Sequence, residues 1–243
     1  MSGSESVKLQ KYVADCGLMS RRAAEERIAD GSIKVNGETV ELGRRIVPGT
    51  DSVTFNGKPV AITGKKRYAY IMLNKPKGYV TSMNDELGRQ CVRDLTEDVG
   101  VRVYPCGRLD KDSEGLLIMT NDGDLAEKLM HPKHHIPKYY TVRVEGKITE
   151  KQLKTLNAPM LIDDYETVPA EVSIIRMTDE STSLAFTLHE GRNRQIRKMC
   201  EQCGLKVEKL KRIAIGEIEL GDLKSGTWRR LSRAQIDYLK NYK

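Results

Sequence analysis

The stretch "GRLDKDSEGLLIMT", residues 107–120, joins a charged loop to an apolar strand. Three acidic side chains, Asp110, Asp112 and Glu114, precede the apolar run that begins at Leu116. A buried strand seldom starts beside three carboxylates, because burying a charge is costly unless a partner compensates it. If the chain is extended here, the three acids share one face, since side chains in a strand repeat every two residues. The stretch therefore predicts a strand that begins near Leu116 and is preceded by a polar loop, and the three acidic side chains of this loop need an explanation of their own.

Three hypotheses fit this acidic cluster. In the first, Asp112 and Ser113 hydrogen-bond the turn before Gly115, and the acids are solvated. In the second, Asp110 and Asp112 provide the hard oxygen ligands that Mg²⁺ prefers, although Lys111 lies between them. In the third, Asp110 is a single catalytic carboxylate, kept ionised by flanking cations and shielded from water by flanking leucines. The residues of the loop leave all three open.

The positive charge of the chain is concentrated in one segment. The 243 residues include 41 Lys and Arg against 34 Asp and Glu, a formal net charge of +7. Residues 191–212 hold eight basic against two acidic side chains, whereas residues 1–60 hold nine against eight. An excess gathered in one place indicates a site for a polyanionic partner rather than a general bias.

This basic segment, "EGRNRQIRKMCEQCG", can also provide the fixed cation that a buried carboxylate needs. It predicts a helix over 193–203, and on a helical wheel its core-facing stripe consists of Ile196, Met199, Cys200 and Cys203. Arg194 and Lys198 point outward to phosphate in this arrangement. Arg197 lies at the boundary, from which it can reach inward to a carboxylate.

The patterns near the start of the chain predict a small α+β domain over residues 1–62, whose first six or so residues are polar and disordered. Residues 9–16 repeat apolar side chains at helical spacing, and Ser20 is a candidate N-cap for a helix over 21–30. Two Asn-Gly turns then join short strands. Residues 63–67 indicate a linker.

Residues 68–243 alternate strands with shorter helices and predict a second α+β domain. Asn121 or Asp122 can cap a helix that follows residue 122, and capping-box spacing appears at Thr149 with Gln152 and again at Ser232 with Gln235. Many neighbouring strands have the pattern of hairpins. We therefore expect a largely antiparallel sheet with flanking helices.

Cysteine usage and hydropathy indicate a reducing compartment and no membrane segment. Five cysteines, an odd number, argue against a disulfide framework. The apolar runs are too short for a membrane span or a signal peptide. We expect a cytoplasmic protein. The pair Cys200 and Cys203 is interpreted as buried thiols rather than as a metal site, because both lie on the apolar stripe.

The N-terminal pattern "VKLQKYVADCGLMSRRAAEERIADGSIKVNGETV" resembles the S4-type RNA-binding domain over residues 7–55. The order of helix, Ser-Arg-Arg turn, second helix, glycine and strand is shared. The resemblance implies that Arg21 and Arg22, with Lys8 and Lys11 nearby, contact RNA phosphates. Such contacts add salt-dependent affinity and little sequence recognition.

Four further motifs, "NKPKGYVTS", "GRLDKDSEGLLIMTNDGDLA", "KYYTVRVEG" and "GRNRQIRKM", resemble in the same order those of bacterial ribosomal-RNA pseudouridine synthases of the RsuA/RluB/RluE/RluF type. The resemblance implies that Asp110 is the catalytic aspartate, that Tyr140 stacks on the target base, and that Arg197 pairs with the aspartate. Arg108 is expected to fill the gap left by the extruded base. The remaining residues expected at the RNA are Arg192, Arg194 and Lys198.

The resemblance implies site-specific conversion of uridine to pseudouridine in ribosomal RNA, with no cofactor and no metal. The wording "RQIRKMCE…KLKRIAIG" is closer to the large-subunit members, so 23S rRNA or a pre-ribosomal particle is the expected partner of a monomer. Two alternatives remain: a non-catalytic RNA-binding or ribosome-assembly factor, and a Mg²⁺-dependent enzyme that uses Asp110 and Asp112.

Overall fold

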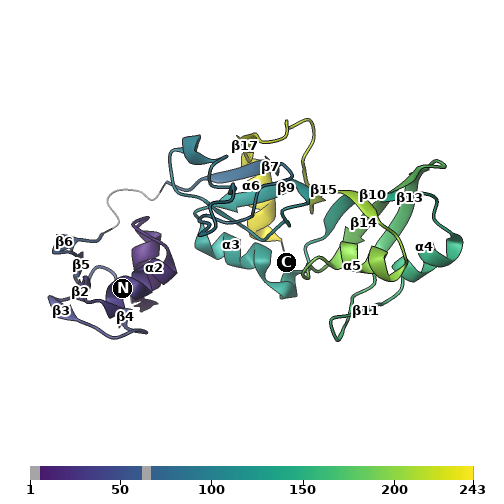
Figure 1. The fold of residues 1–243 in the computed structure, drawn as a ribbon. Coiled ribbons are helices and arrows are strands. Elements are labelled where there is room, and N and C mark those ends of the chain that lie inside the picture. The colour runs from purple at the N-terminus through teal and green to yellow at the C-terminus, as the bar shows by residue number, and fades with distance from the viewer. Residues whose placement is uncertain (1–5, 62–66, 243) are drawn as a thin grey trace. The chain divides into compact units, whose positions relative to one another are not determined.

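The computed structural model describes residues 6–61 and 67–242, which belong to two compact units, Met1–Arg67 and Tyr68–Lys243 (Figure 1). Residues 1–5, most of the segment predicted to be disordered, lie outside the described residues. The predicted linker, residues 63–67, lies outside them as well except for Arg67.

The first unit packs two helices against small antiparallel sheets. Its helices are α1 (Leu9–Asp15) and α2 (Arg21–Ala29). One sheet has the order β3 (Glu38–Thr39), β2 (Ile33–Val35), β5 (Val53–Phe55), β6 (Lys58–Pro59), and the other pairs β1 (Val7–Lys8) with β4 (Arg45–Ile46). This arrangement confirms the small α+β unit expected from the sequence.

Local sequence explains the boundaries in this unit. The Oγ of Ser20 accepts a hydrogen bond from the amide of Ala23 at 3.1 Å, so Ser20 caps α2 as predicted. Leu9 and Val13 from the predicted apolar face of α1 are fully buried. Both residues of the Asn36-Gly37 turn have positive φ, as a tight hairpin with the right-handed strand twist requires.

The second unit is built on one large, mostly antiparallel sheet. Its main path has the order β13 (Glu171–Met177), β14 (Ser181–Leu188), β10 (Lys138–Glu145), β15 (Val207–Ile215), β9 (Glu114–Thr120), β7 (Tyr70–Lys75), β17 (Trp228–Arg230). Two short strands pair at its side, β8 (Tyr104–Pro105) with β9 and β16 (Ile218–Glu219) with β15. A separate hairpin joins β11 (Leu161–Ile162) to β12 (Tyr165–Glu166). Among the described strands of the sheet, β9 and β15 form a parallel pair.

Four α-helices, α3 (Gly123–Met130), α4 (Glu150–Leu156), α5 (Gln195–Gln202) and α6 (Arg233–Asn241), flank this sheet. Figure 1 shows α3 and α6 beside the β7–β9 half and α4 and α5 beside the β10–β13–β14 half. Asp122 caps α3, and both predicted capping boxes are present, at the starts of α4 and α6. In the described part of the chain, no helix is long and apolar enough to cross a membrane.

The parallel junction between β9 and β15 depends on Gly115. This residue pairs with Arg212 and has φ +109°, a conformation that side chains rarely allow. A Cβ atom at position 115 would lie 2.2 Å from the carbonyl oxygen of Arg212. Only glycine therefore lets the two halves of the sheet approach at this point, directly after the acidic loop.

We predict that Gly115→Ala lowers the free energy of unfolding by about 3 kcal/mol or more, because the methyl group strains the backbone and displaces β15. Denaturant-induced unfolding measures the change. Gly146→Ala is the matched control: Gly146 has φ +70°, but a Cβ atom there would meet no other atom within 4 Å, so a loss of about 1 kcal/mol is expected. Equal losses in the two variants would contradict the packing argument.

Candidate active site

The loop between β8 and β9 presents Asp110 to solvent from an apolar base. The side chain of Asp110 is 28% exposed, while Leu109 beside it and Leu116 in β9 are buried. The amide of Ser113 donates to the carbonyl of Asp110 at 3.0 Å and closes a turn. The carboxylate therefore stands at the edge of the core, partly desolvated and still accessible.

Lys75, the last residue of β7, holds this loop from inside the protein. It is fully buried, and its Nζ donates hydrogen bonds to three carbonyl oxygens: Pro76 at 3.0 Å, Asp110 at 3.1 Å and Ser113 at 2.8 Å. These acceptors match the three donors of an ammonium group. Burial lowers the pKa of Lys75 to about 8, while the nearby carboxylates, Asp110 first, act in the opposite direction. Sequence reasoning missed Lys75, although a lysine at the end of a mostly apolar strand was the available signal.

The segment after β7 clamps the same loop a second time. Thr81 Oγ1 donates to the carbonyl of Leu109 at 2.6 Å and accepts from its amide at 3.1 Å. The amide of Gly78 donates to the carbonyl of Lys111 at 2.8 Å. The motifs "NKPKGYVTS" and "GRLDKDS", which are well separated in the chain, thus form one structural unit around Asp110.

Arg194, not Arg197, is the cation nearest the Asp110 carboxylate among the described residues. Arg194 Nη1 lies 3.8 Å from Asp110 Oδ2 and 3.7 Å from Asp112 Oδ2. Arg197 Nη2 donates to the main-chain carbonyl of Asp112 at 3.0 Å, and its Nε is buried without a hydrogen-bond partner. The predicted ion pair of Arg197 with Asp110 is therefore wrong for this structure, as is the outward direction predicted for Arg194.

The physical reason lies at the start of α5. The helix begins at Gln195, two residues later than predicted, and Arg194 is its N-cap in the left-handed conformation with φ 52°. A residue outside the helix does not follow the helical wheel, so Arg194 turns back toward the acidic loop. Of the four residues predicted to face the core, Ile196, Met199 and Cys200 are buried and Cys203 is half-buried.

The three acids of the loop do not share one strand face, because only Glu114 belongs to β9, while Asp110 and Asp112, both within 4 Å of Arg194 Nη1, precede it. The chain turns between Asp110 and Ser113 and becomes extended only at Glu114, whose carboxylate pairs with Lys209 at 3.0 Å. The expected shared face is therefore wrong. Ser113 Oγ is buried without a partner, so its hydroxyl does not bond the turn as the structural hypothesis supposed.

A cavity of about 710 Å³ opens in front of Asp110. Tyr140 from β10 lines it, whereas Tyr139 is not among the lining residues, which is consistent with the alternation of side chains along a strand. Tyr140 is 8% exposed, and Arg108 contributes an exposed guanidinium to the same lining. Of the residues predicted to be catalytic, Asp110 and Tyr140 therefore meet in one cavity.

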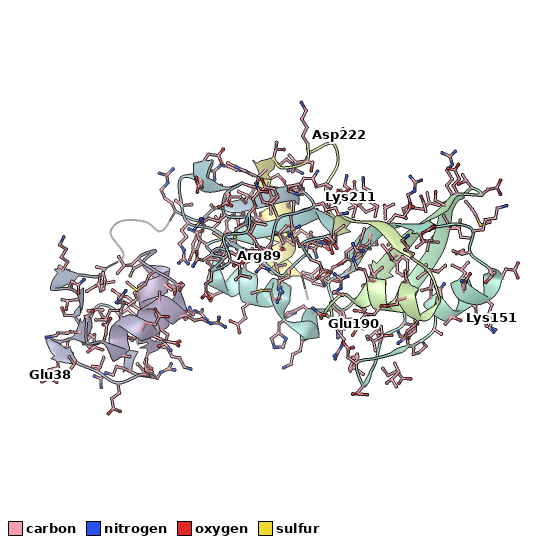
Figure 2. The ribbon with its side chains drawn as sticks, viewed as in Figure 1. Glu38, Arg89, Lys151, Glu190, Lys211 and Asp222 are labelled. Carbon is pink, nitrogen blue, oxygen red and sulfur yellow. The ribbon has the colours of Figure 1, made fainter. Side chains whose placement is uncertain are left out.

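A second wall of the cavity is formed where the β11–β12 hairpin meets the segment before α5. The guanidinium of Arg192 lies 3.0 Å from the ring centroid of Tyr165, and Tyr165 Oη donates to Glu190 Oε2 at 3.3 Å. Figure 2 labels Glu190, which also accepts from Gln195 Nε2 at 2.6 Å. Arg192 Nε also lies 3.8 Å from Glu190 Oε2, and the side chain remains 46% exposed at the rim. Lys198 pairs with Asp163 of the hairpin, and its predicted contact with RNA phosphates stays a prediction.

The RNA-binding residues predicted in the first unit stay predictions. Arg21 and Arg22 are exposed in the first turn of α2, and Lys8 is exposed in β1. Lys11 forms an ion pair with Asp15 at 3.3 Å on α1. The exposed arginines are the ones best placed to meet phosphates.

Among the described residues, no group of three or more His, Cys, Asp or Glu side chains is arranged to hold a metal ion. Cys200 is a free thiol, and burial raises its pKa to about 12. The interpretation of Cys200 as a buried structural thiol agrees with this environment.

Comparison with known proteins identifies the class of this site. Residues 69–202, which include Asp110 and Tyr140, match the family model described as RNA pseudouridylate synthase. The chain belongs to this family. Residues 7–53 match the S4 domain model. The expected fold is thereby confirmed: an S4 domain followed by an RNA pseudouridine synthase domain, whose members are isomerases.

Relatives match over nearly the whole chain. A ribosomal large subunit pseudouridine synthase B from Bacillus subtilis (strain 168) is 39% identical, with 96% of this chain and 95% of the relative covered. The dual-specificity RNA pseudouridine synthase RluF from Escherichia coli (strain K12) is 36% identical over 97% of this chain and 79% of its own. A crystal structure of a pseudouridylate synthase superposes with a TM-score of 0.68 at 29% identity, covering 96% and 99% of the two chains.

We predict that Lys75→Met lowers the free energy of unfolding by about 3 kcal/mol and slows turnover at least about tenfold, because three buried carbonyls lose their donor and the Asp110 loop loosens. Urea unfolding and single-turnover pseudouridine formation measure the two effects. Lys77→Met, an exposed lysine two residues on, should change neither. A stable, fully active Lys75→Met variant would show that the loop is held by other contacts.

Proposed function

We propose that this RNA pseudouridine synthase isomerises a specific uridine in ribosomal RNA, and that its substrate is the large-subunit 23S rRNA. The observation that carries the proposal is Asp110, a partly desolvated carboxylate facing a cavity that Tyr140 also lines. The relative named for the large ribosomal subunit, similar over the full chain, supports the choice of RNA.

The reaction breaks the bond between ribose carbon 1′ and base nitrogen 1 and joins the same carbon to carbon 5. These atoms are inaccessible in a base stack, so the uridine must flip out at a cost of a few kcal/mol. A cavity of about 710 Å³ has room for the flipped nucleoside. Isomerisation consumes no second substrate. The protein therefore accelerates it by positioning the uridine and by placing charged groups around the base.

Each side chain of the cavity then has a definite task. Asp110 faces the ribose and acts as a nucleophile at the glycosidic carbon or as a base toward a neighbouring ribose proton, with Arg194 Nη1 3.8 Å from its Oδ2. Tyr140 offers its ring to the uracil. Arg108 and Arg192 are exposed at the rim, where they neutralise backbone phosphates and Arg108 fills the space of the extruded base.

The S4 domain adds non-specific affinity in this proposal. Arg21 and Arg22 at the start of α2 contact phosphates, which makes binding salt-dependent without choosing the uridine. The uridine is selected by the shape of the RNA that binds around the cavity. We further propose that the protein is a monomer of the bacterial cytoplasm that acts on free or assembling large-subunit RNA.

We predict that Asp110→Asn slows pseudouridine formation by about a thousandfold or more while RNA binding stays within about twofold of wild type, because the amide keeps the shape and loses the charge. Asp112→Asn is the matched control and should keep most activity, since the structure uses the carbonyl of Asp112, which the substitution preserves. Single-turnover assays with mass spectrometry of the nucleosides distinguish the two. An active Asp110→Asn variant would sink the assignment.

We predict that 23S rRNA gains about one pseudouridine per molecule and that 16S rRNA gains none, because a pocket that reads shape accepts few RNA contexts. Chemical mapping of pseudouridine on both transcripts, with and without large-subunit precursor particles, measures this. Modification of 16S rRNA alone would contradict the proposed substrate. Binding to 23S rRNA without product on transcripts or particles would favour the rival hypothesis of a non-catalytic assembly factor.

A further inference from the structure

Two cations line the cavity without a carboxylate to balance them. Lys138 and Arg212 lie on the neighbouring strands β10 and β15, and both belong to the cavity lining. Their hydrogen bonds go to main-chain carbonyls: Lys138 Nζ donates to Ile136 at 2.9 Å, and Arg212 Nε donates to Leu116 at 2.7 Å. Within residues 6–61 and 67–242, neither cation has an ion-pair partner among the Asp and Glu side chains.

Arg212 is buried and Lys138 is half-buried, which makes this arrangement costly. Arg212 is 3% exposed, and its Nη2 is buried without a hydrogen-bond partner in the described structure. Burial, and to a smaller extent the charge of Arg212, lowers the pKa of Lys138 to about 8, so the ammonium form still prevails at neutral pH. Natural proteins rarely leave such groups unpaired unless a ligand completes them.

The two cations surround the ring that is proposed to meet the uracil. Lys138 precedes Tyr140 by two residues on β10, so their side chains share a face of the sheet. Arg212 is the partner of Tyr140 in the neighbouring strand, and its guanidinium carbon lies 6.0 Å from the ring centroid. A base held against Tyr140 would therefore place its polar edge close to unpaired N–H donors.

The isomerisation creates a charge that such donors can stabilise. When the bond from carbon 1′ to nitrogen 1 breaks, its electron pair stays with the ring, and the resulting uracilate anion spreads the charge over N1, O2 and O4. Carbon 1′, left electron-poor, bonds to the carboxylate of Asp110, or the neighbouring carbon 2′ gives its proton to that carboxylate. The ring then bonds to carbon 1′ through C5 as the bond to Asp110 breaks or the proton returns to carbon 2′, and the proton lost from C5 is matched by one gained at N1. No other reactant is needed.

We propose that Lys138, together with Arg212, binds a carbonyl oxygen of the flipped uracil and stabilises the uracilate anion while the glycosidic bond is broken. This inference rests on the proposed function. A backbone phosphate is the other anion that RNA could offer. The exposed guanidiniums of Arg108 and Arg192 are better placed for phosphate, because phosphates stay at the rim while the flipped base enters the buried end.

The test compares Lys138→Met, Lys138→Arg and the control Lys151→Met, whose lysine is exposed on α4, is labelled in Figure 2 and is not part of the cavity lining. We expect Lys138→Met to lower the single-turnover rate by about a hundredfold, with partial recovery in Lys138→Arg and no effect in the control. The dissociation constant for RNA and its salt dependence should stay unchanged. The Lys138→Met variant should melt at or above the wild-type temperature, because a half-buried charge without an ion-pair partner has been removed.

A substrate with a better leaving group provides the decisive readout. RNA carrying 5-fluorouridine at the target position forms a more stable ring anion, because fluorine withdraws electrons. The defect of Lys138→Met, measured as the rate at which the N1-linked fluoronucleoside disappears, should therefore be several-fold smaller than with uridine. A purely structural role would leave the defect the same for both substrates.

Three results would overturn the inference while wild type remains active: an unimpaired Lys138→Met variant, a defect that fluorine does not reduce, or weaker RNA binding with a reduced salt slope, which would assign Lys138 to a phosphate. Absence of product from the wild-type protein on every rRNA substrate would instead overturn the proposed function, and the inference with it.

Discussion

The ammonium group of Lys75 fixes the position of the catalytic loop, and the rest of the site depends on it. Its three hydrogen bonds tie the carbonyls of Pro76, Asp110 and Ser113 to the end of β7. A loop would otherwise be the least ordered part of such a site. Since the lysine belongs to the central sheet and is fully buried, it holds the backbone of Asp110 in a fixed position relative to the core. Gly115 then lets β9 reach β15 directly after the loop.

The site concentrates positive charge in an apolar setting, and this has an energetic cost. Lys75 and Arg212 are buried, Lys138 is half-buried, and buried polar atoms without a hydrogen-bond partner in the described structure include Ser113 Oγ, Arg197 Nε and Arg212 Nη2. These three unpartnered atoms lie on the acidic loop, on α5 and on β15. Buried charges and buried polar atoms without a hydrogen-bond partner are concentrated where a protein binds a ligand or performs a reaction. In the proposed function, an RNA nucleotide supplies an oxygen acceptor to Lys138 and Arg212, which line the cavity.

Sequence patterns predicted the interactions between residues close in the chain and missed those between residues far apart in it. Caps at Ser20, Thr149 and Ser232, and the apolar stripe of α5, follow from interactions within a few residues, and all are present. The direction of Arg194 was predicted wrongly because it depends on where α5 begins. The role of Lys75 depends on contacts with residues more than thirty positions away, which no periodicity encodes. The resemblance to known synthases supplied Asp110 and Tyr140, and the geometry added Lys75, Lys138 and Arg212.

The central claim is that Asp110 and its cavity exchange the carbon–nitrogen link of a uridine for a carbon–carbon link. Release of tritium from rRNA labelled at uridine carbon 5 tests it most directly, because that hydrogen leaves only when the new bond forms. With EDTA present, the account predicts release that saturates at about one site per 23S rRNA and disappears in Asp110→Asn. Release that EDTA abolishes, or that persists without the carboxylate, would contradict the account and return the acidic loop to the magnesium or structural hypotheses.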